Sequence, residues 1–209
     1  MIIQALYERY TQLASDPNSG VSPLYFSAGK VSYVLMIDKE GNLLRIDDVR
    51  QQSGKKLAPI TVTVPEQASR SSGDFPYFLC DKAEYVLGHY VVTAKETETV
   101  KKRTDAQRKH KKGADLAWEV LQGVEDEAGR AVLAFYERWN PDEVREHPLV
   151  RPILADLDKG IDTNMTFRLA GDEGLICRNE AMKEAWTCYR RRQDGSGGEA
   201  GQCLVTGGR

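Results

Sequence analysis

The chain has 209 residues, of which 41% are hydrophobic and 29% are charged. These values exclude a fibrous, collagen-like or wholly disordered protein, and the length suits one good hydrophobic core or two small ones. The 29 basic side chains stand against 31 acidic ones, which excludes a histone-like protein coated with positive charge. A surface that binds nucleic acid must therefore be local.

The sequence shows neither a targeting signal nor a paired cysteine motif. No run of about 18 apolar residues is present, and the first residues lack the basic-then-apolar order of a signal peptide. We expect a cytoplasmic chain without membrane contacts. The cysteines are scattered without a C-x-x-C pair, so we expect reduced, structural thiols and no metal or other cofactor. They are Cys80, Cys177, Cys188 and Cys203.

The first part of the chain predicts an antiparallel sheet preceded by a helix. Residues 2–14 carry apolar side chains at helical spacing and predict an amphipathic opening helix. Residues 31–37 are almost continuously β-favouring, and a turn leads from them into 43–46, which predicts a buried hairpin. Residues 60–64 alternate with period two and predict a third strand, which ends at Pro65.

The two segments that follow this sheet differ in character. Residues 66–76 are small and turn-forming, and they predict an ordered loop because aromatic residues anchor both sides. From Lys95 to Lys112 the chain becomes strongly basic and almost free of apolar residues. Such a run cannot fold by itself through apolar burial.

The second half is predicted to be mainly helical. Residues 116–124 and 128–139 carry apolar side chains at helical spacing and predict two packed helices, with a short third helix at 149–157. Residues 165–169 and 175–177 flank a Gly-Asp-Glu-Gly turn and predict a small β-hairpin.

The last predicted elements are a capped helix and a linker. Asn179 is expected to cap a helix that runs through Tyr189, with the cations of residues 190–192 at the negative end of its dipole. Residues 193–201 have the composition of a linker, and 202–206 resume a strand-like pattern. A strand that begins so close to the end suggests a longer parent protein.

The predicted fold class is α+β, an antiparallel sheet with an N-terminal helix, followed by a mostly helical half with a small β-hairpin. We divide the chain into three parts. They are a sheet-containing part (1–92), a basic segment with a helical part (93–192), and a linker with the start of a further segment (193–209).

Catalytic signatures are scarce. No nucleophile elbow, phosphate-binding loop or H-E-x-x-H motif occurs, and lone histidines are more often structural than catalytic. Three neighbouring aspartates match no EF-hand order. We therefore expect a non-enzyme without a metal site, and the alternative is a nuclease that holds a metal through Asp and Glu. The residues considered are His89, His110, His147, Asp156, Asp158 and Asp162.

The basic run carries the most specific chemical signal. Dense Lys and Arg side chains release counterions from a polyanion and give salt-sensitive, sequence-independent affinity. A solvated helix face or a loop is the alternative, but the charge surplus is local in a slightly acidic protein and favours phosphate binding. A turn at 53–56 adds two lysines. The expected phosphate contacts are Lys55, Lys56, Lys101, Lys102, Arg103, Arg108, Lys109, Lys111 and Lys112.

The loop at residues 70–76 is a second candidate contact with nucleic acid. Gly73 allows close backbone approach, and Ser71 and Ser72 place small hydrogen-bonding groups beside Arg70. A loop of this kind fits a DNA minor groove, and a plain connection between strands is the alternative.

Three blocks in matching order resemble one protein family. They are residues 3–7 (Ile-Gln-Ala-Leu-Tyr), residues 70–88 with Arg-Ser-Ser-Gly, Phe78-Leu79, Asp81 and Tyr-Val-Leu-Gly, and residues 201–207 (Gly-Gln-Cys-Leu-Val-Thr-Gly). Together they resemble the large subunit of the subtype I-C CRISPR Cascade surveillance complex, the Csd or Cas-eight group. The resemblance also implies that the chain is an N-terminal domain of a longer protein.

The resemblance implies a non-enzymatic, DNA-binding subunit of a crRNA-guided complex in antiviral defence. It would lie near the crRNA 5′ handle and the Cas-five-type and Cas-seven-type subunits, recognise the protospacer-adjacent motif (PAM) on duplex DNA and help to open the duplex. A recruited helicase-nuclease would then cut. The alternative is a module that holds the crRNA handle or docks other subunits without DNA specificity of its own.

The chain departs from the family pattern around the Phe-Leu pair. Tyr77 and Lys82 stand where many members carry asparagine. We expect either that the preferred PAM differs or that Tyr77 stacks or wedges where an amide would hydrogen-bond. The expected PAM and minor-groove contacts are Arg70, Ser71, Ser72, Gly73, Asp74, Tyr77 and Lys82.

Overall fold

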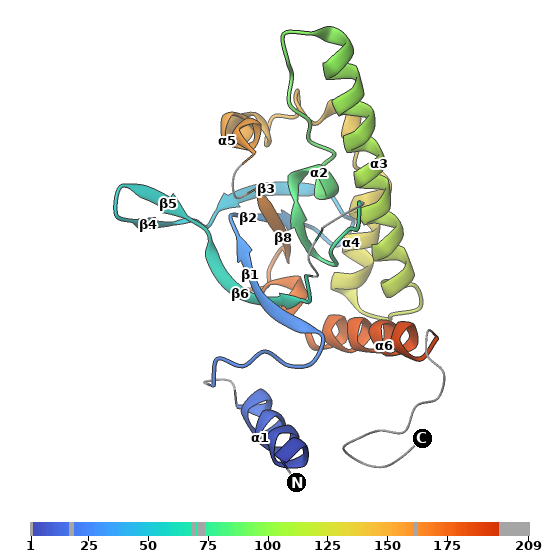
Figure 1. The fold of residues 1–209 in the computed structure, drawn as a ribbon. Coiled ribbons are helices and arrows are strands. Elements are labelled where there is room, and N and C mark those ends of the chain that lie inside the picture. The colour runs from blue at the N-terminus through green and yellow to red at the C-terminus, as the bar shows by residue number, and fades with distance from the viewer. Residues whose placement is uncertain (1, 17–18, 68–69, 71–73, 161–162, 197–209) are drawn as a thin grey trace.

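The computed structural model describes residues 2–16, 19–67, 70, 74–160 and 163–196, and it confirms the α+β class. The chain opens with helix α1 (Ile2–Ser15), as its apolar spacing predicts. This helix lies apart from the rest of the molecule (Figure 1), and most of its apolar side chains are exposed.

The central sheet has four strands in the order β3-β2-β8-β7. The predicted hairpin is confirmed as the antiparallel pair of β2 (Tyr33–Ile37) and β3 (Leu43–Asp48). Strand β8 (Asn164–Leu169) lies parallel to β2, and β7 (Cys80–Lys82) lies antiparallel to β8. The sheet is therefore mixed, whereas the sequence predicted a purely antiparallel one.

The turn between β2 and β3 packs directly on a helix. Gly41 has a φ of +81°, and a side chain there would place its Cβ 2.3 Å from the backbone nitrogen of Phe135. Only glycine fits both the left-handed backbone and this close approach.

Two smaller sheets complete the β structure. The predicted strand at 60–64 is confirmed as β6 (Ile60–Pro65), but it pairs with β1 (Phe26–Val31), for which no strand was predicted. Strands β4 (Gln51–Ser53) and β5 (Lys56–Ala58) form a tight hairpin that projects from the body (Figure 1).

The helices lie mainly at one side of the sheets (Figure 1). Helix α3 unites the basic run and the predicted helix at 116–124, and α4 confirms the helix predicted at 128–139. The predicted third helix is confirmed as a 3-10 turn followed by α5. The bounds are α2 (Ala83–Val86), α3 (Glu96–Leu121), α4 (Glu127–Arg138), η1 (Pro141–Glu143), η2 (Arg151–Ile153) and α5 (Leu154–Lys159).

The hairpin predicted at 165–177 is half correct. Its first arm is β8, but its second arm is the 3-10 helix η3 (Ile176–Arg178). Both edges of β8 are already occupied, by β2 and β7, so no edge remains to pair with residues 175–177. A small hairpin is present elsewhere in the described residues, as β4–β5.

Asn179 caps helix α6 (Glu180–Ser196), as predicted, because its Oδ1 accepts a hydrogen bond from the Ala181 N–H at 2.8 Å. The helix continues past Tyr189 to Ser196, so the prediction that residues 190–192 form its last turn was wrong. The strand predicted at 202–206 lies outside the described residues.

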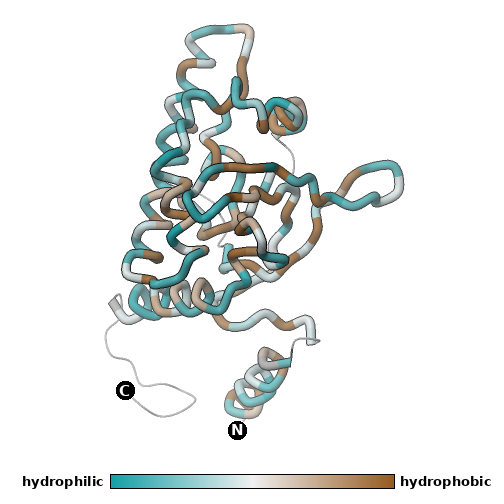
Figure 2. Tube along the Cα trace, turned by 180° about the vertical axis from the view of Figure 1, so that it is seen from behind, coloured by the Kyte–Doolittle hydropathy of each residue, from teal (hydrophilic) through white to brown (hydrophobic). Residues whose placement is uncertain are grey.

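The hydrophobic core joins the central sheet to the helices. Phe167 of β8 meets Phe135 of α4 edge to face, with ring centroids 5.2 Å apart, and Phe135 also stacks on Trp139 at 5.5 Å. Figure 2 shows hydrophobic residues concentrated along the central strands and hydrophilic residues along much of α3 and at the hairpin tip.

The N-cap of α4 offers a stability test. Asp126 accepts hydrogen bonds from the N–H groups of Ala128 (2.9 Å) and Gly129 (3.2 Å). Because Asp126→Ala leaves these donors without an acceptor, we expect it to lower the free energy of unfolding by about 1 kcal/mol. Urea denaturation measures this, and Glu125→Ala, one residue before the cap, should change it much less. Equal effects of the two variants would contradict the capping role.

Candidate nucleic-acid interface

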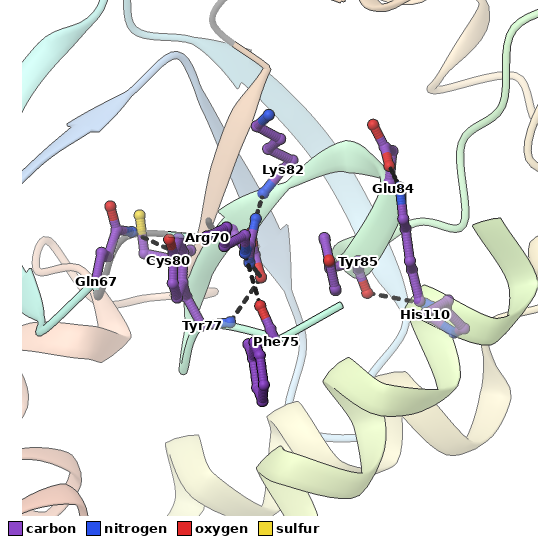
Figure 3. Close-up of polar contacts among 11 residues, drawn as sticks. Gln67, Arg70, Phe75, Tyr77, Cys80, Lys82, Glu84, Tyr85 and His110 are labelled. Carbon is purple, nitrogen blue, oxygen red and sulfur yellow. Dashed lines mark hydrogen bonds and ion pairs between the residues drawn. The ribbon is translucent and has the colours of Figure 1, made fainter. Parts of the chain in front are cut away.

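Arg70 lies within a packed cluster beside β7 (Figure 3). Its guanidinium carbon lies 3.7 Å from the ring centroid of Tyr77 and 4.2 Å from that of Tyr85. Its Nε donates to the carbonyl oxygen of Phe75 at 2.6 Å, and its Nη2 donates to Asp81 Oδ2 at 2.5 Å. Its side chain is only 16% exposed, so these partners, and not solvent, fix its orientation.

Asp81 is the anionic centre of this cluster. Its side chain is only 3% exposed, and it also accepts hydrogen bonds from the N–H groups of Tyr77 and Lys82, each at 2.7 Å. Burial raises the pKa of Asp81, and the Arg70 guanidinium opposes this shift. A buried carboxylate is tolerated when a cation and hydrogen-bond donors surround it, and it becomes costly when the cation is removed.

The cluster brings together several of the predicted PAM contacts. Arg70 points toward Asp81, Tyr77 stacks on Arg70, and the exposed side chain of Lys82 follows Asp81 directly. Asp74 forms an ion pair with Arg108 of α3. The remaining predicted contacts, Ser71, Ser72 and Gly73, lie outside the described residues.

The basic run forms much of α3, and carboxylates lie against most of its cations. Such pairs reduce the positive field that a phosphate backbone would meet, although exposed pairs are individually weak. Lys101 and Lys112 have no carboxylate partner in the described part of the chain. The ion pairs are Lys102 with Glu98 (3.4 Å), Arg103 with Asp142 (2.8 Å), Arg108 with Asp74 and with Asp105 (3.1 Å), Lys109 with Glu84, and Lys111 with Asp115 (2.8 Å).

The hairpin β4–β5 carries cations of a different kind. Lys55 and Lys56 are exposed at its tip, and neither forms an ion pair with any described residue. Gly54 adopts a φ of +62° at the turn, and Gln52 Nε2 donates to its carbonyl oxygen at 2.7 Å. Leu57 beside them is 51% exposed. The hairpin therefore presents two uncompensated positive charges and an apolar side chain to solvent.

Sequence reasoning selected the lysines of this hairpin but missed Gln52 and Leu57. The sequence contained a signal for this hairpin. Residues 51–56 are polar, include no carboxylate and contain a Gly-Lys turn, and Leu57 follows them directly. A third missed residue is Phe75, which is 64% exposed on the segment that carries Asp74 and Tyr77.

The histidines and aspartates considered for catalysis take part in structural contacts. His89 lies 3.0 Å from Asp158, which also forms an ion pair with Arg145 at 2.7 Å. Asp156 forms ion pairs with Arg50 and Lys159, each at 2.8 Å.

His110 is buried in α3, where its Nδ1 lies 3.2 Å from the carbonyl oxygen of Tyr85, and burial lowers its pKa to about 4. Among the residues that the structure describes, no group of three His, Cys, Asp or Glu side chains is placed to hold a metal ion. Asp162 lies outside these residues. Within the same ranges, no helix is both long and apolar enough to cross a membrane.

Comparison with known proteins identifies the family. A search of curated proteins gives no match. The model of the family described as CRISPR-associated protein (Cas_Csd1) matches residues 6–209, which include the Arg70 cluster, the hairpin β4–β5 and helix α3. This match confirms the resemblance noted from the sequence blocks. The chain therefore belongs to the Cas_Csd1 family of CRISPR-associated proteins, which supports a place in a Cascade-type complex.

Proposed function

We propose that this chain is the DNA-binding part of the large subunit of a type I-C CRISPR surveillance complex. In this proposal it recognises the PAM on duplex DNA, helps to open the duplex, and has no catalytic activity of its own. The crRNA and the Cas-five-type and Cas-seven-type subunits are its partners, and a recruited helicase-nuclease cuts the DNA. Family membership supports the complex, and the observation that carries DNA binding is the uncompensated charge on the projecting hairpin.

The hairpin has the chemistry of a groove-binding element. A two-stranded β-ribbon fits the major groove of B-DNA, where apolar side chains contact the thymine methyl group. Lys55 and Lys56 supply the phosphate contacts and Leu57 the apolar contact. Because the cations of α3 are largely paired, we place the main phosphate contact on the hairpin.

PAM recognition is assigned to the residues around Asp81. In guided systems base pairing reads the long sequence, so the protein needs to recognise only a short duplex tag. Lys82 is exposed, and the main chain at Tyr77 and Lys82 is held by Asp81. A fixed main chain supports recognition because ordering it on binding would weaken affinity.

The salt dependence of duplex binding tests the hairpin. We expect Lys55→Ala combined with Lys56→Ala to flatten the slope of log K against log salt by about 1.8, since each phosphate contact contributes about 0.9. The matched control is Lys102→Ala with Lys111→Ala, which removes the same charge from ion-paired positions and should change the slope much less. Fluorescence anisotropy with a labelled duplex measures both. Equal slopes for wild type and the hairpin variant would exclude the hairpin from the interface.

PAM recognition and the absence of catalysis need separate measurements. A panel of duplexes that differ only in the PAM positions should show graded affinity, and equal affinity for all of them would reduce the proposal to non-specific binding.

Plasmid DNA incubated with the protein and Mg²⁺ or Mn²⁺ should stay intact. Cleavage would favour the metal-dependent nuclease.

The exposed apolar face of α1 favours a second candidate function, a crRNA-handle or subunit-docking module. Ile2, Leu6 and Tyr7 are all exposed on this helix, and exposed apolar patches mark interaction sites. This alternative predicts that the chain ignores duplex DNA at moderate salt but co-purifies with the Cas-five-type subunit.

A further inference from the structure

A groove of 650 Å³ lies between residues 74–76, the second half of α3 and the end of α6. In Figure 1, α6 crosses the end of α3 at the lower right, while the hairpin β4–β5 projects at the left. Aromatic rings line the groove. Phe75 is 64% exposed, while Trp186 and Tyr189 form part of the wall.

Carboxylates outnumber cations along this groove. The acidic residues are Asp74, Asp115, Glu119 and Asp194, and the basic ones are Lys112 and Arg190. The positive charge of Arg190 is already engaged, because Arg190 forms an ion pair with Glu66 at 3.2 Å and lies over the Trp186 ring at 5.6 Å. Asp74 and Asp115 have cationic partners in Arg108 and Lys111.

Glu119 and Asp194 have no cationic partner among the described residues, and Lys112 is the groove cation that no described carboxylate pairs with, so the groove keeps a net negative charge. Glu119 accepts a hydrogen bond from the Tyr189 hydroxyl at 3.1 Å, and Asp194 accepts one from the Tyr25 hydroxyl at 2.7 Å. A hydroxyl donor orients a carboxylate without neutralising it. Neither carboxylate forms an ion pair with a Lys or Arg among the residues described.

We propose that this groove binds a segment of a protein partner that carries arginine or lysine. The cationic side chain lies between Glu119 and Asp194 and against the rings of Phe75 and Tyr189. Aromatic faces attract cations through their quadrupole, and exposed aromatic anchors in a groove are typical binding hot spots. The same carboxylates repel a phosphate backbone. This surface is therefore distinct from the hairpin, and the inference does not rest on DNA binding.

Calorimetric titration of the full chain with a hexa-arginine peptide tests the groove. We expect wild type to bind the peptide and Glu119→Gln combined with Asp194→Asn to weaken binding about tenfold or more, because two charge contacts are lost. Phe75→Ala should weaken it about threefold or more by removing the aromatic contact. The control, Glu125→Gln with Glu173→Gln, removes the same charge at exposed positions outside the groove and should retain nearly full affinity.

Three results would overturn the proposal. They are the absence of peptide binding to wild type, equal weakening by the groove and control variants, and full affinity in Phe75→Ala. Equal weakening would mean that only the net charge of the protein attracts the peptide. Duplex affinity of the same variants is measured in parallel, and we expect it to stay within about twofold of wild type, so failure here is distinguishable from failure of the DNA-binding proposal.

Discussion

Arg70→Met should lower the free energy of unfolding at neutral pH by about 3 kcal/mol, because it leaves the buried Asp81 carboxylate without its cation. Methionine keeps the apolar stem and removes the guanidinium, which lies between two rings and against Asp81. Arg70→Lys keeps the charge but loses the planar stacking and the second donor, so a smaller loss is expected. Urea denaturation followed by circular dichroism measures both variants.

The pH dependence of this loss identifies Asp81 as its cause. Burial already raises the pKa of Asp81 in the folded protein, and removing Arg70 raises it further. A raised carboxyl pKa means that the folded state binds protons more readily than the unfolded state, so this group favours folding increasingly as pH falls. The loss in Arg70→Met should therefore shrink between pH 7 and pH 5.

A double variant provides the control. In Arg70→Met combined with Asp81→Asn, no buried charge remains, so the two losses should not add, and a double-mutant cycle should give a coupling of at least about 1 kcal/mol. If Arg70→Met instead keeps full stability and loses duplex affinity, Arg70 contacts DNA rather than stabilising the fold.

Local periodicity predicted most individual elements. The helices at 2–14 and 128–139 and the hairpin of β2 and β3 carry uninterrupted apolar patterns, and the structure confirms them. Strand β1 was missed because Gly29 and Lys30 interrupt its apolar pattern. Gly29 is required there, since a Cβ would come 2.3 Å from Val64 Cγ2 on the paired strand.

Pairing between distant segments could not be predicted from local patterns. Strand β8 lies parallel to β2, and this neighbour is set by the packing of both strands against α4 and not by any turn. The prediction of a hairpin after β8 failed for the same reason, because β7 had already occupied the free edge. The spacing of residues in the sequence does not show which strand edges are already paired with another strand.

Helix α3 shows how a charged run can hide helical periodicity. Its buried positions form a narrow stripe at helical spacing within the basic segment and beyond it, and the small residues among them allow close packing. Because only Ala106 and His110 are buried within the basic segment itself, the charges dominated the prediction. The stripe is Ala106, His110, Gly113 and Ala117.

The sequence predicted which residue types form the candidate site, but not which of these side chains pair with one another. Arg70, Asp74 and Arg108 were each selected as contacts with nucleic acid from their chemistry. The structure connects Arg70 to Asp81 and Asp74 to Arg108. Side chains that satisfy one another cannot be recognised from a one-dimensional charge pattern, so the density of cations overstates the charge available to phosphates on α3.

Phe167→Ala should strongly destabilise the core, with an expected loss of about 4 kcal/mol in the free energy of unfolding. Phe167 has no exposed surface and lies on β8, between β2 and β7, so the structure cannot collapse into the space without disturbing the paired strands. Its ring also meets Phe135 at 5.2 Å and Tyr136 at 6.0 Å, and these edge contacts are lost as well. Leu57→Ala, on the exposed hairpin, should cost less than about 0.5 kcal/mol. Similar losses in the two variants, measured by urea denaturation, would mean that the strands around β8 do not form the core described above.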